Sequence, residues 1–183
     1  MKKLVYLTLF VLFANMLVAC AKATPEVVEG MLNPGDKIGS MTVIEHSPLT
    51  STPNLGKYCG QYFLDETKAG ISTVDCALPS VSRVRFDMGW GTVNETTLNS
   101  NWSAMVWELQ IDDHPINIDQ FKLRDVRGAG RVSRGWSIDL VDLTPGKHTI
   151  RAVWTSETPI DDGFDTYAAG THEHIVNLTV AEK

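Results

Sequence analysis

Hydrophobic and polar residues alternate along much of the chain after about residue 80. Large, mostly apolar side chains occupy every second position in the stretches 84–90, 105–111, 136–140, 148–154 and 172–180. A period of two places all of these side chains on one face of an extended strand. One apolar face and one polar face are typical of antiparallel strands that cover a core on one side only. We therefore expect a strand in each stretch.

Turn residues separate these stretches. The sequence DDHP at 112–115 predicts a tight hairpin, and Pro145-Gly146 predicts a turn because proline presets φ and glycine accepts a positive φ. We expect long exposed loops at 125–135 and 155–171, and no segment beyond the N-terminus has the pattern of an amphipathic helix. Several strands separated by turns predict an all-β protein, an antiparallel β-sandwich, with a closed barrel as the alternative.

The N-terminus has a different pattern. Lys2 and Lys3 precede an uncharged, mostly apolar run from residue 4 to residue 19, which is typical of a secretory signal helix. The run ends in Leu17-Val18-Ala19-Cys20, which resembles the lipobox of bacterial lipoproteins. The resemblance implies that the Cys20 thiol receives a diacylglyceryl group and that a signal peptidase cleaves just before it. An ordinary signal peptide with a chance cysteine is the alternative.

The resemblance also implies a domain organisation and a compartment. We expect a lipoprotein signal peptide at 1–19, a lipidated tether at 20–30 and a single β-sandwich domain at 31–183. The domain would lie outside the cytoplasm, anchored to the cell membrane or the outer membrane through the lipid on Cys20. Single acyl chains anchor proteins only marginally, whereas lipoprotein processing supplies two or three.

The remaining cysteines and the charge fit an extracytoplasmic domain. With Cys20 assigned to lipid, Cys59 and Cys76 remain as a pair, which predicts a disulfide outside the cytoplasm. A cysteine pair on a metal is the alternative, although zinc sites usually have closer spacing and further ligands nearby. The chain carries 16 basic and 22 acidic residues, a formal charge of −6. This acidic balance argues against nucleic acid as a partner.

Two C-terminal stretches resemble immunoglobulin-like and fibronectin-like modules. LVDLTPGKHTIRAVW has the leucine, the Pro-Gly turn and the alternating strand of their penultimate strand, and HEHIVNLTV is similar to their closing strand. The resemblance implies an Ig-like sandwich and nothing about chemistry, because sandwiches host unrelated functions. The chain beyond Cys20 is also similar to uncharacterised bacterial surface lipoproteins.

Histidine and aspartate residues suggest possible metal sites. His172 and His174 are two residues apart, so they share one face of a strand and could bind one zinc ion together with further ligands. Asp161, Asp162 and Asp165 surround a glycine in a predicted loop, and calcium prefers such oxygen ligands. Hydrogen-bonded imidazoles and a solvated acidic loop are the alternatives. We therefore expect no cofactor, with zinc or calcium as the possible exceptions.

Aromatic and basic residues suggest possible partners. Trp107 and Trp154 lie in the alternating apolar rows and are expected in the core, whereas Trp90 or Trp102 could contact a ligand such as a sugar. Trp102 lies among polar residues at an expected strand start. The basic residues of the expected loop could meet an anionic partner or balance nearby aspartates; they are Arg124, Arg127, Arg131 and Arg134.

The sequence contains none of the common catalytic signatures, such as G-x-S-x-G, a P-loop or H-E-x-x-H, so we do not expect an enzyme. The first hypothesis is a lipid-anchored, extracytoplasmic domain that binds or scaffolds an envelope glycan or protein. A carbohydrate-binding module of the envelope is the second. A metal-binding protein or metal-dependent enzyme is the third.

Overall fold

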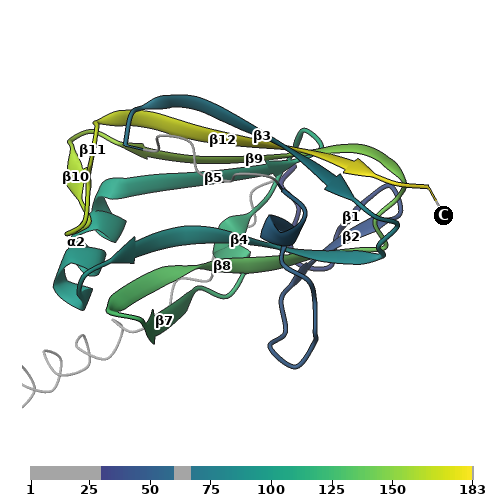
Figure 1. Ribbon diagram of the computed structural model, residues 1–183, viewed down its shortest axis with the longest axis horizontal. Helices are drawn as coiled ribbons and strands as arrows, with labels where there is room; N and C mark the ends of the chain where they lie inside the picture. Colours follow the sequence, from purple (N-terminus) through teal and green to yellow (C-terminus); the bar gives the residue numbers. More distant parts are fainter. Residues whose placement is uncertain (1–29, 60–66, 183) are drawn as a thin grey trace, which may run out of the picture.

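The structure is a computed structural model that describes residues 30–59 and 67–182. The expected signal peptide, Cys20 and the tether up to residue 29 lie outside the described residues. Figure 1 shows two sheets packed face to face, which we call the lower sheet and the upper sheet. The expectation of an all-β sandwich is confirmed, and these two sheets are not closed into a barrel.

The lower sheet is built around β8, which pairs with β4 along one edge and with β2 and β7 along the other. All of its described pairs are antiparallel. Its strands are β1 (Lys37–Ile38), β2 (Met41–Glu45), β4 (Arg83–Thr92), β7 (Arg124–Gly128) and β8 (Arg131–Val141).

The upper sheet has the strand order β3-β12-β9-β5-β6. Its strands are β3 (Gly70–Leu78), β5 (Met105–Ile111), β6 (His114–Pro115), β9 (Gly146–Ser156) and β12 (Gly170–Val180). A separate hairpin consists of β10 (Ile160–Asp161) and β11 (Thr166–Tyr167).

One strand pair corrects the prediction of a purely antiparallel sandwich. β3 runs parallel to β12 over its whole length, from Gly70 opposite His172 to Leu78 opposite Val180. Parallel neighbours need a long connection, and here the chain passes through both sheets between the two strands. Alternation reveals which face of a strand is buried but not the direction of its neighbour, so the sequence pattern could not show this pair.

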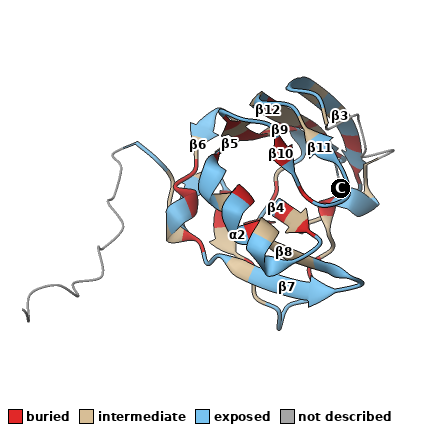
Figure 2. Cartoon of the chain, turned by 90° about the vertical axis from the view of Figure 1, so that its left-hand side faces the viewer, coloured by how far each residue is buried: buried red, intermediate tan, exposed pale blue. Residues whose placement is uncertain are grey.

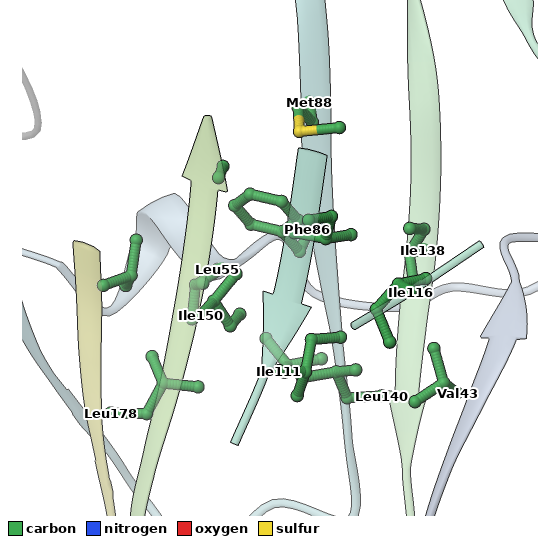
Figure 3. Packing of buried hydrophobic residues seen from close by; sticks show 14 of the residues in the cluster. Val43, Leu55, Phe86, Met88, Ile111, Ile116, Ile138, Leu140, Ile150 and Leu178 are labelled. Atoms are coloured by element: carbon green, nitrogen blue, oxygen red, sulfur yellow. The ribbon is translucent and has the colours of Figure 1, made fainter. Parts of the chain in front are cut away.

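The core lies between the sheets and contains the alternating rows expected from the sequence. On β4, Val84, Phe86, Met88 and Trp90 are buried. Ile111, Ile138, Leu140 and Ile150 from both sheets are fully buried and pack together in the middle of the sandwich (Figure 3). Burial of each such side chain contributes about 1.5–3 kcal/mol to the free energy of folding. The hydrophobic core thus holds the two sheets together.

An α-helix, α2 (Glu95–Ala104), corrects the expectation of no helix beyond the signal peptide. It begins at Asn94, whose side chain accepts a hydrogen bond from Thr97 N at 2.9 Å, a common N-cap contact. Only Leu98 and Asn101 of this helix are buried, so its sequence lacks the apolar stripe that identifies an amphipathic helix. Figure 2 looks onto the end of the sandwich where α2 lies.

Short helical turns complete the described elements: the 3-10 helices η1 (Leu55–Lys57) and η2 (Ile118–Gln120). Among the residues that the structure describes, no helix has both the length and the apolar character needed to cross a membrane.

The basic segment 125–135 is another correction, because it forms most of the β7–β8 hairpin instead of a loop. Ala129 and Gly130 make its turn with φ values of 50° and 75°. Most residues of this segment are charged or glycine, and Val126 is 64% exposed. The sequence therefore shows no row of buried apolar residues that would identify these strands. The expected loop at 155–171 contains β10 and β11.

A glycine pair brings β4 and β8 unusually close together. Gly89 lies opposite Gly135, and a Cβ atom at Gly89 would lie 2.3 Å from the carbonyl oxygen of Arg134. A Cβ atom at Gly135 would meet the carbonyl oxygen of Met88 at the same distance. Only residues without a side chain fit at these two positions.

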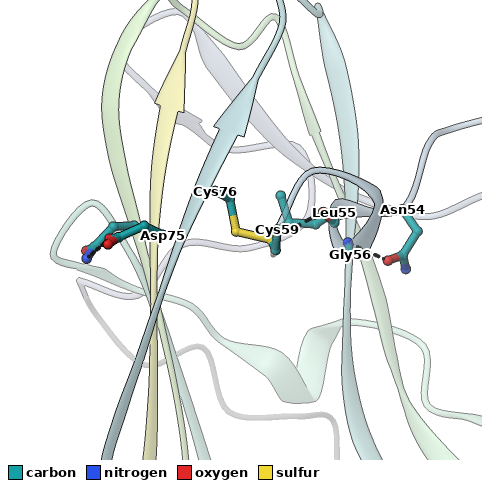
Figure 4. Close-up of a disulfide and its surroundings, with 7 residues drawn as sticks. Asn54, Leu55, Gly56, Cys59, Asp75 and Cys76 are labelled. Carbon is teal, nitrogen blue, oxygen red and sulfur yellow. Dashed lines mark hydrogen bonds between the residues drawn. A yellow bond between two sulfur atoms is a disulfide. The ribbon is translucent and has the colours of Figure 1, made fainter. Parts of the chain in front are cut away.

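Cys59 and Cys76 form the disulfide that the cysteine count predicts (Figure 4). Cys76 is a buried residue of β3, and Cys59 follows η1, which lies beside β4. Arg85 N of β4 donates to Pro53 O at 2.9 Å, so the segment 53–59 connects the free edges of β3 and β4. The disulfide therefore covers part of the open side of the sandwich, where the edge strands β3 and β4 face each other.

Candidate functional site

A pocket remains on the same open side of the sandwich, where the edge strands β3 and β4 face each other. Residues 72–74 of β3 and 86–90 of β4 form its mouth, and residues of β5, β9 and β12 form its floor. The volume is about 220 Å³, and the pocket is partly open to solvent. We call it the inter-sheet pocket.

The side chains of the inter-sheet pocket come from the inward-facing rows of the strands. Their burial follows from the period of two, which directs every second residue between the sheets. The side chains that define the walls are Phe86, Met88, Trp90, Trp107, Trp154, His174 and Val176. These aromatic and aliphatic side chains share the pocket walls with a nearly equal polar surface.

Two indole N–H groups at the pocket have no hydrogen-bond partner. The Nε1 atoms of Trp90 and Trp107 are buried, and neither has an acceptor within the described residues. A buried indole N–H usually has a partner, and leaving a buried donor unpaired costs about 1–3 kcal/mol. Trp90 is 8% exposed and forms part of the pocket wall. Both nitrogen atoms are enclosed by protein atoms, so an acceptor oxygen in the pocket does not reach them.

Aromatic contacts fix the position of the Trp90 ring. Its centroid lies 5.2 Å from that of Trp154 and 4.6 Å from that of Tyr167, both in edge-to-face geometry. Trp154 in turn stacks on His172 at 3.7 Å with an angle of 8° between the planes. Edge-to-face pairs contribute about 0.5–1.5 kcal/mol beyond area burial, so the indole is held before any ligand arrives.

Among the described residues, no unpaired charge lines the inter-sheet pocket. Of these, only Asp87 has a carboxylate or a basic group other than imidazole, and its Oδ2 atom accepts hydrogen bonds from Asn54 and from Arg85 Nε. His174 Nδ1 lies 2.8 Å from Ser72 Oγ. The described walls therefore offer an ionic ligand no unpaired charge of opposite sign to offset its lost hydration.

The two tryptophans proposed as ligand contacts occupy different environments. Trp90 lies at the inter-sheet pocket, but Trp102 lies in α2 and not at a strand start, which corrects its expected position. The Trp102 ring stacks on Trp107 at 5.3 Å, and the Arg134 guanidinium lies 5.8 Å from its centroid. Trp102 therefore packs against the pocket's Trp107 without lining the pocket itself.

The two histidines proposed as metal ligands share the inner face of β12 but have other partners. His172 Nε2 lies 2.9 Å from Ala168 O, its ring stacks on Trp154, and it is 2% exposed. His174 is next to Ser72. No group of three or more histidine, cysteine or acidic side chains in the described part of the chain is arranged to hold a metal ion.

The proposed calcium ligands shape the β10–β11 hairpin. Asp162 is buried, and its Oδ1 atom accepts hydrogen bonds from the backbone N–H groups of Phe164 and Asp165 at 2.7 and 2.8 Å. Asp161 Oδ1 accepts from Gly163 N at 2.7 Å. Asp165 contributes backbone groups to these contacts. The carboxylates of Asp161 and Asp162 thus stabilise a tight turn.

The four arginines of the β7–β8 region are largely balanced by acidic or aromatic partners. Arg134 makes a two-pronged contact with Asp125, and this hydrogen bonding lowers the pKa of Asp125 and raises that of Arg134. Arg124 pairs with Glu45, Arg127 pairs with Glu95, and the Arg131 guanidinium lies 4.3 Å from the ring centroid of Phe164. The cluster is therefore not a free positive patch.

Sequence reasoning missed a buried charged network on the outer side of β8. Asp139 is 0% exposed and accepts hydrogen bonds from Arg83 Nε at 3.0 Å, Thr52 Oγ1 at 3.2 Å and His46 Nδ1 at 3.0 Å. Asp139 occupies an outward position in the alternating pattern, where an aspartate is unremarkable. The covering segment that buries it comes from a distant part of the chain, so no local pattern could identify it.

Comparisons with known proteins do not identify a family. No family model and no curated protein matches the chain. One similar solved structure is PbICP-C in complex with falcipain-2, at 15% identity and a TM-score of 0.35, covering 63% of this chain and 92% of that chain. Another is the cysteine protease inhibitor EhICP2 from Entamoeba histolytica, at 14% identity and a TM-score of 0.28, covering 62% and 96%. Likeness at this level carries no functional argument.

Proposed function

We propose that this chain is a lipid-anchored, extracytoplasmic binding domain whose ligand occupies the inter-sheet pocket. One observation carries the proposal of a ligand site: a partly open pocket between the two sheets, lined by three aromatic side chains from both sheets, Phe86, Trp107 and Trp154. Pockets of this kind with a few placed polar groups are typical ligand sites. The aromatic contacts of Trp90 support the proposal because a preorganised site loses less entropy on binding.

The lipobox residues 17–20 support the anchor. Residues 21–30 could extend about 36 Å at most, so the domain would remain near the membrane surface. Cys20→Ser tests this half directly through the intact mass of the mature protein and its partition into the membrane fraction. We expect loss of the acyl mass and release from the membrane. Unchanged mass and retention in this variant would overturn the anchor.

The pocket half has its own test. Ala152 lines the inter-sheet pocket, so Ala152→Leu would fill part of its volume with apolar atoms. Neutral fragments of pocket size can be screened for an increase in the melting temperature of the wild-type domain. We expect some of them to bind the wild type and to lose at least tenfold in affinity for the variant. Fragments that bind both proteins equally would show that this pocket is not the binding site.

Carbohydrate binding is a second candidate, favoured by the tryptophan and phenylalanine side chains that line the pocket. Sugars are commonly recognised by ring stacking and hydrogen bonds, and aromatic faces combine with polar handles in tryptophan. Because Trp90 is buried, a sugar would enter the inter-sheet pocket and not lie on an exposed aromatic platform. The metal-binding alternative stays a prediction, and metal analysis of the purified protein tests it.

We also infer that the sandwich is Ig-like. Chain order supports this assignment, because β5-β9-β12 would correspond to the strand order C-F-G and β4-β8-β7 to B-E-D. On this assignment α2 forms the connection between strands B and C, and the β10–β11 hairpin forms that between F and G. An experimental structure in which β7 or β12 had a different neighbour would contradict it.

A further inference from the structure

The strand β7 has a free edge that lies away from the inter-sheet pocket, because β7 and β4 flank β8 on opposite sides. We propose that this edge pairs with β7 of a second copy of the chain, in an antiparallel dimer whose two-fold axis passes through Val126. The pairing neither uses nor requires a ligand in the inter-sheet pocket. The direction of the backbone groups, the exposure of Val126 and the charge pattern of β7 all favour it.

The backbone of β7 has one hydrogen-bonded side and one free side. The two-residue turn at 129–130 fixes the hairpin so that the even-numbered residues of β7 exchange hydrogen bonds with odd-numbered residues of β8. The same alternation continues along this side of β8, where Ser137 O accepts a hydrogen bond from His46 N. Asp125 and Arg127 therefore direct their backbone N–H and C=O groups away from β8. Neither N–H has an acceptor among the residues that the structure describes.

The free edge of β7 is open to solvent. Residues 125–128 are exposed, and Figure 2 shows β7 as an exposed strand at the border of the lower sheet. No described strand pairs with β7 on the side away from β8. Val126, in the middle of the strand, is 64% exposed. A further strand added at this edge would satisfy the backbone groups and cover the valine, as unpaired edges generally allow.

The charges of β7 select a second copy of the same strand as the partner. In an antiparallel pair centred on Val126, Asp125 of one copy lies opposite Arg127 of the other, and this pair occurs twice. Each of the two pairs exchanges backbone hydrogen bonds through its free N–H and C=O groups. Opposite charges that face each other across two strands stabilise the pair. The edge is therefore complementary to itself, as a two-fold interface requires.

The same charges disfavour the neighbouring two-fold registers. A pair centred on Asp125 would place Asp125 opposite its own copy, and a pair centred on Arg127 would place the two Arg127 residues opposite each other. Like charges in these positions repel. The register centred on Val126 also brings the two valines together in a non-hydrogen-bonded pair, where opposite side chains approach most closely. Charge and apolar burial thus favour one register.

The ion pairs within one copy leave both charges available to a partner. Asp125 accepts one hydrogen bond from Arg134 at each carboxylate oxygen, and a carboxylate has about four acceptor sites. Arg127 pairs with Glu95, but the two side chains are 68% and 56% exposed. Exposed ion pairs contribute little and rearrange easily. Asp125 and Arg127 can therefore contact the second copy while β7 keeps its fold.

The dimer should be weak in dilute solution. A contact between two strands of five residues is smaller than the interface of about 1,200 Å² that stable complexes bury. Mass action favours the dimer wherever copies of the chain are concentrated. The proposed lipid anchor would concentrate them on a membrane surface, so the dimer should be populated there. This concentration effect rests on the proposed function, whereas the strand pairing itself does not.

Cysteine cross-linking of the full chain in cell membranes gives a direct test. Under mild oxidation Val126→Cys should form a disulfide-linked dimer on a non-reducing gel, because the two side chains lie directly opposite each other. Val106→Cys is the matched control, because Val106 is 65% exposed but lies on the outer face of β5. The native Cys59 and Cys76 already form a disulfide, so they do not compete for the new thiol.

The proposal requires a dimer from Val126→Cys and little or none from Val106→Cys. Equal cross-linking of the two variants would show random collision, and no cross-linking of Val126→Cys would show that the edge stays free. Both results would overturn the pairing. A disulfide from Val126→Cys to a different protein would reject the second copy as the partner.

Charge reversal in the Val126→Cys background tests the register. Asp125→Lys places a lysine opposite Arg127 of the other copy, and Arg127→Glu places a glutamate opposite Asp125. Each variant alone should give about tenfold less dimer, because two pairs change from attraction to repulsion. When both variants are made in one cell they should cross-link to each other, since every introduced charge then faces an opposite one. Undiminished cross-linking of the single variants would contradict the register. If Asp125→Lys unfolds the hairpin, the comparison of Val126→Cys with Val106→Cys still decides.

The dimer and the lipid anchor can fail separately. The intact mass of the mature chain reports the anchor alone. Val126→Cys combined with Cys20→Ser, purified and concentrated, should still cross-link, because the strand pair needs concentration and not lipid. Loss of cross-linking in this concentrated protein would reject the strand pair and leave the anchor standing.

Discussion

Gly89 of β4 packs closely against Gly135 of β8. We therefore predict that Gly89→Ala and Gly91→Ala, both on β4, change the stability of the domain by very different amounts. A Cβ atom at Gly89 would lie 2.3 Å from Arg134 O and 2.7 Å from the Cα atom of Gly135. A Cβ atom at Gly91 would meet a side chain, Ser133 Oγ, at 2.8 Å. Backbone atoms can yield only if β4 and β8 separate, whereas a serine hydroxyl can rotate to another rotamer.

The expected magnitudes follow from these distances. Nonbonded carbon atoms prefer about 3.5–4.0 Å, so Gly89→Ala forces the strands apart by about 1 Å. Overpacking of this kind costs about 1–3 kcal/mol. Replacing glycine by alanine in a strand otherwise gains about 0.5–1 kcal/mol of backbone entropy, so Gly91→Ala should be neutral or slightly stabilising. The two variants should differ by about 2 kcal/mol.

Urea unfolding followed by circular dichroism measures this difference, and thermal unfolding provides a second readout. For a domain of this size about 2 kcal/mol corresponds to a difference of about 4–8 °C in melting temperature. Gly135→Ala should behave like Gly89→Ala, because its Cβ atom would meet Met88 O at 2.3 Å. If Gly89→Ala were as stable as Gly91→Ala, the close approach of β4 and β8 would be wrong.

Other variants test the disulfide and the polar contacts. Replacing Cys59 and Cys76 together by alanine should cost about 3 kcal/mol, given their separation of 17 residues, and reduction of the wild type should lower stability similarly. A loss below 1 kcal/mol by urea unfolding would contradict this. Asp139→Ala should cost about 3 kcal/mol, because it leaves the buried His46 and the half-buried Arg83 without the carboxylate that they contact, and near-native stability would count against the network. Glu173→Gln should cost about 0.5–1 kcal/mol at pH 7, because hydrogen bonds from Arg151 lower the pKa of Glu173. Since the folded pKa lies below the unfolded value, the stabilisation is present above pH 4–5 and disappears in acid. The curves of wild type and variant should therefore converge at low pH, and a constant gap would contradict the assignment.

The strands of the core could be predicted because side-chain direction on a strand has a fixed period. The rows ending at Trp90, Ile111 and Trp154 appear in the sequence and are buried or half-buried as expected. Local patterns failed where the structure depends on distant residues. β3 has an exposed Ile71 and a partner 100 residues away, and α2 depends on the Asn94 cap more than on an apolar face.

The inter-sheet pocket could be predicted only in part. The alternation assigns Trp107 and Trp154 to the inner face of their strands, and the structure places both at the pocket wall. The sequence does not contain the distance between the two sheets, so it cannot distinguish a packed interior from a gap. The unpaired state of Trp90 Nε1 is likewise a property of the assembled sandwich.

The parallel pairing of β3 with β12 has a consequence for biogenesis. The only sheet neighbour of β3 among the described strands is made about 100 residues later, so an emerging chain must wait for residues 170–180 before this edge is occupied. Such long-range pairing is slow, and unpaired strand edges invite association with other chains in the meantime. Truncation before residue 170 should therefore yield aggregates and not a smaller soluble domain. Chaperones that shield nascent strands should matter more for this protein than for a sandwich closed by successive hairpins.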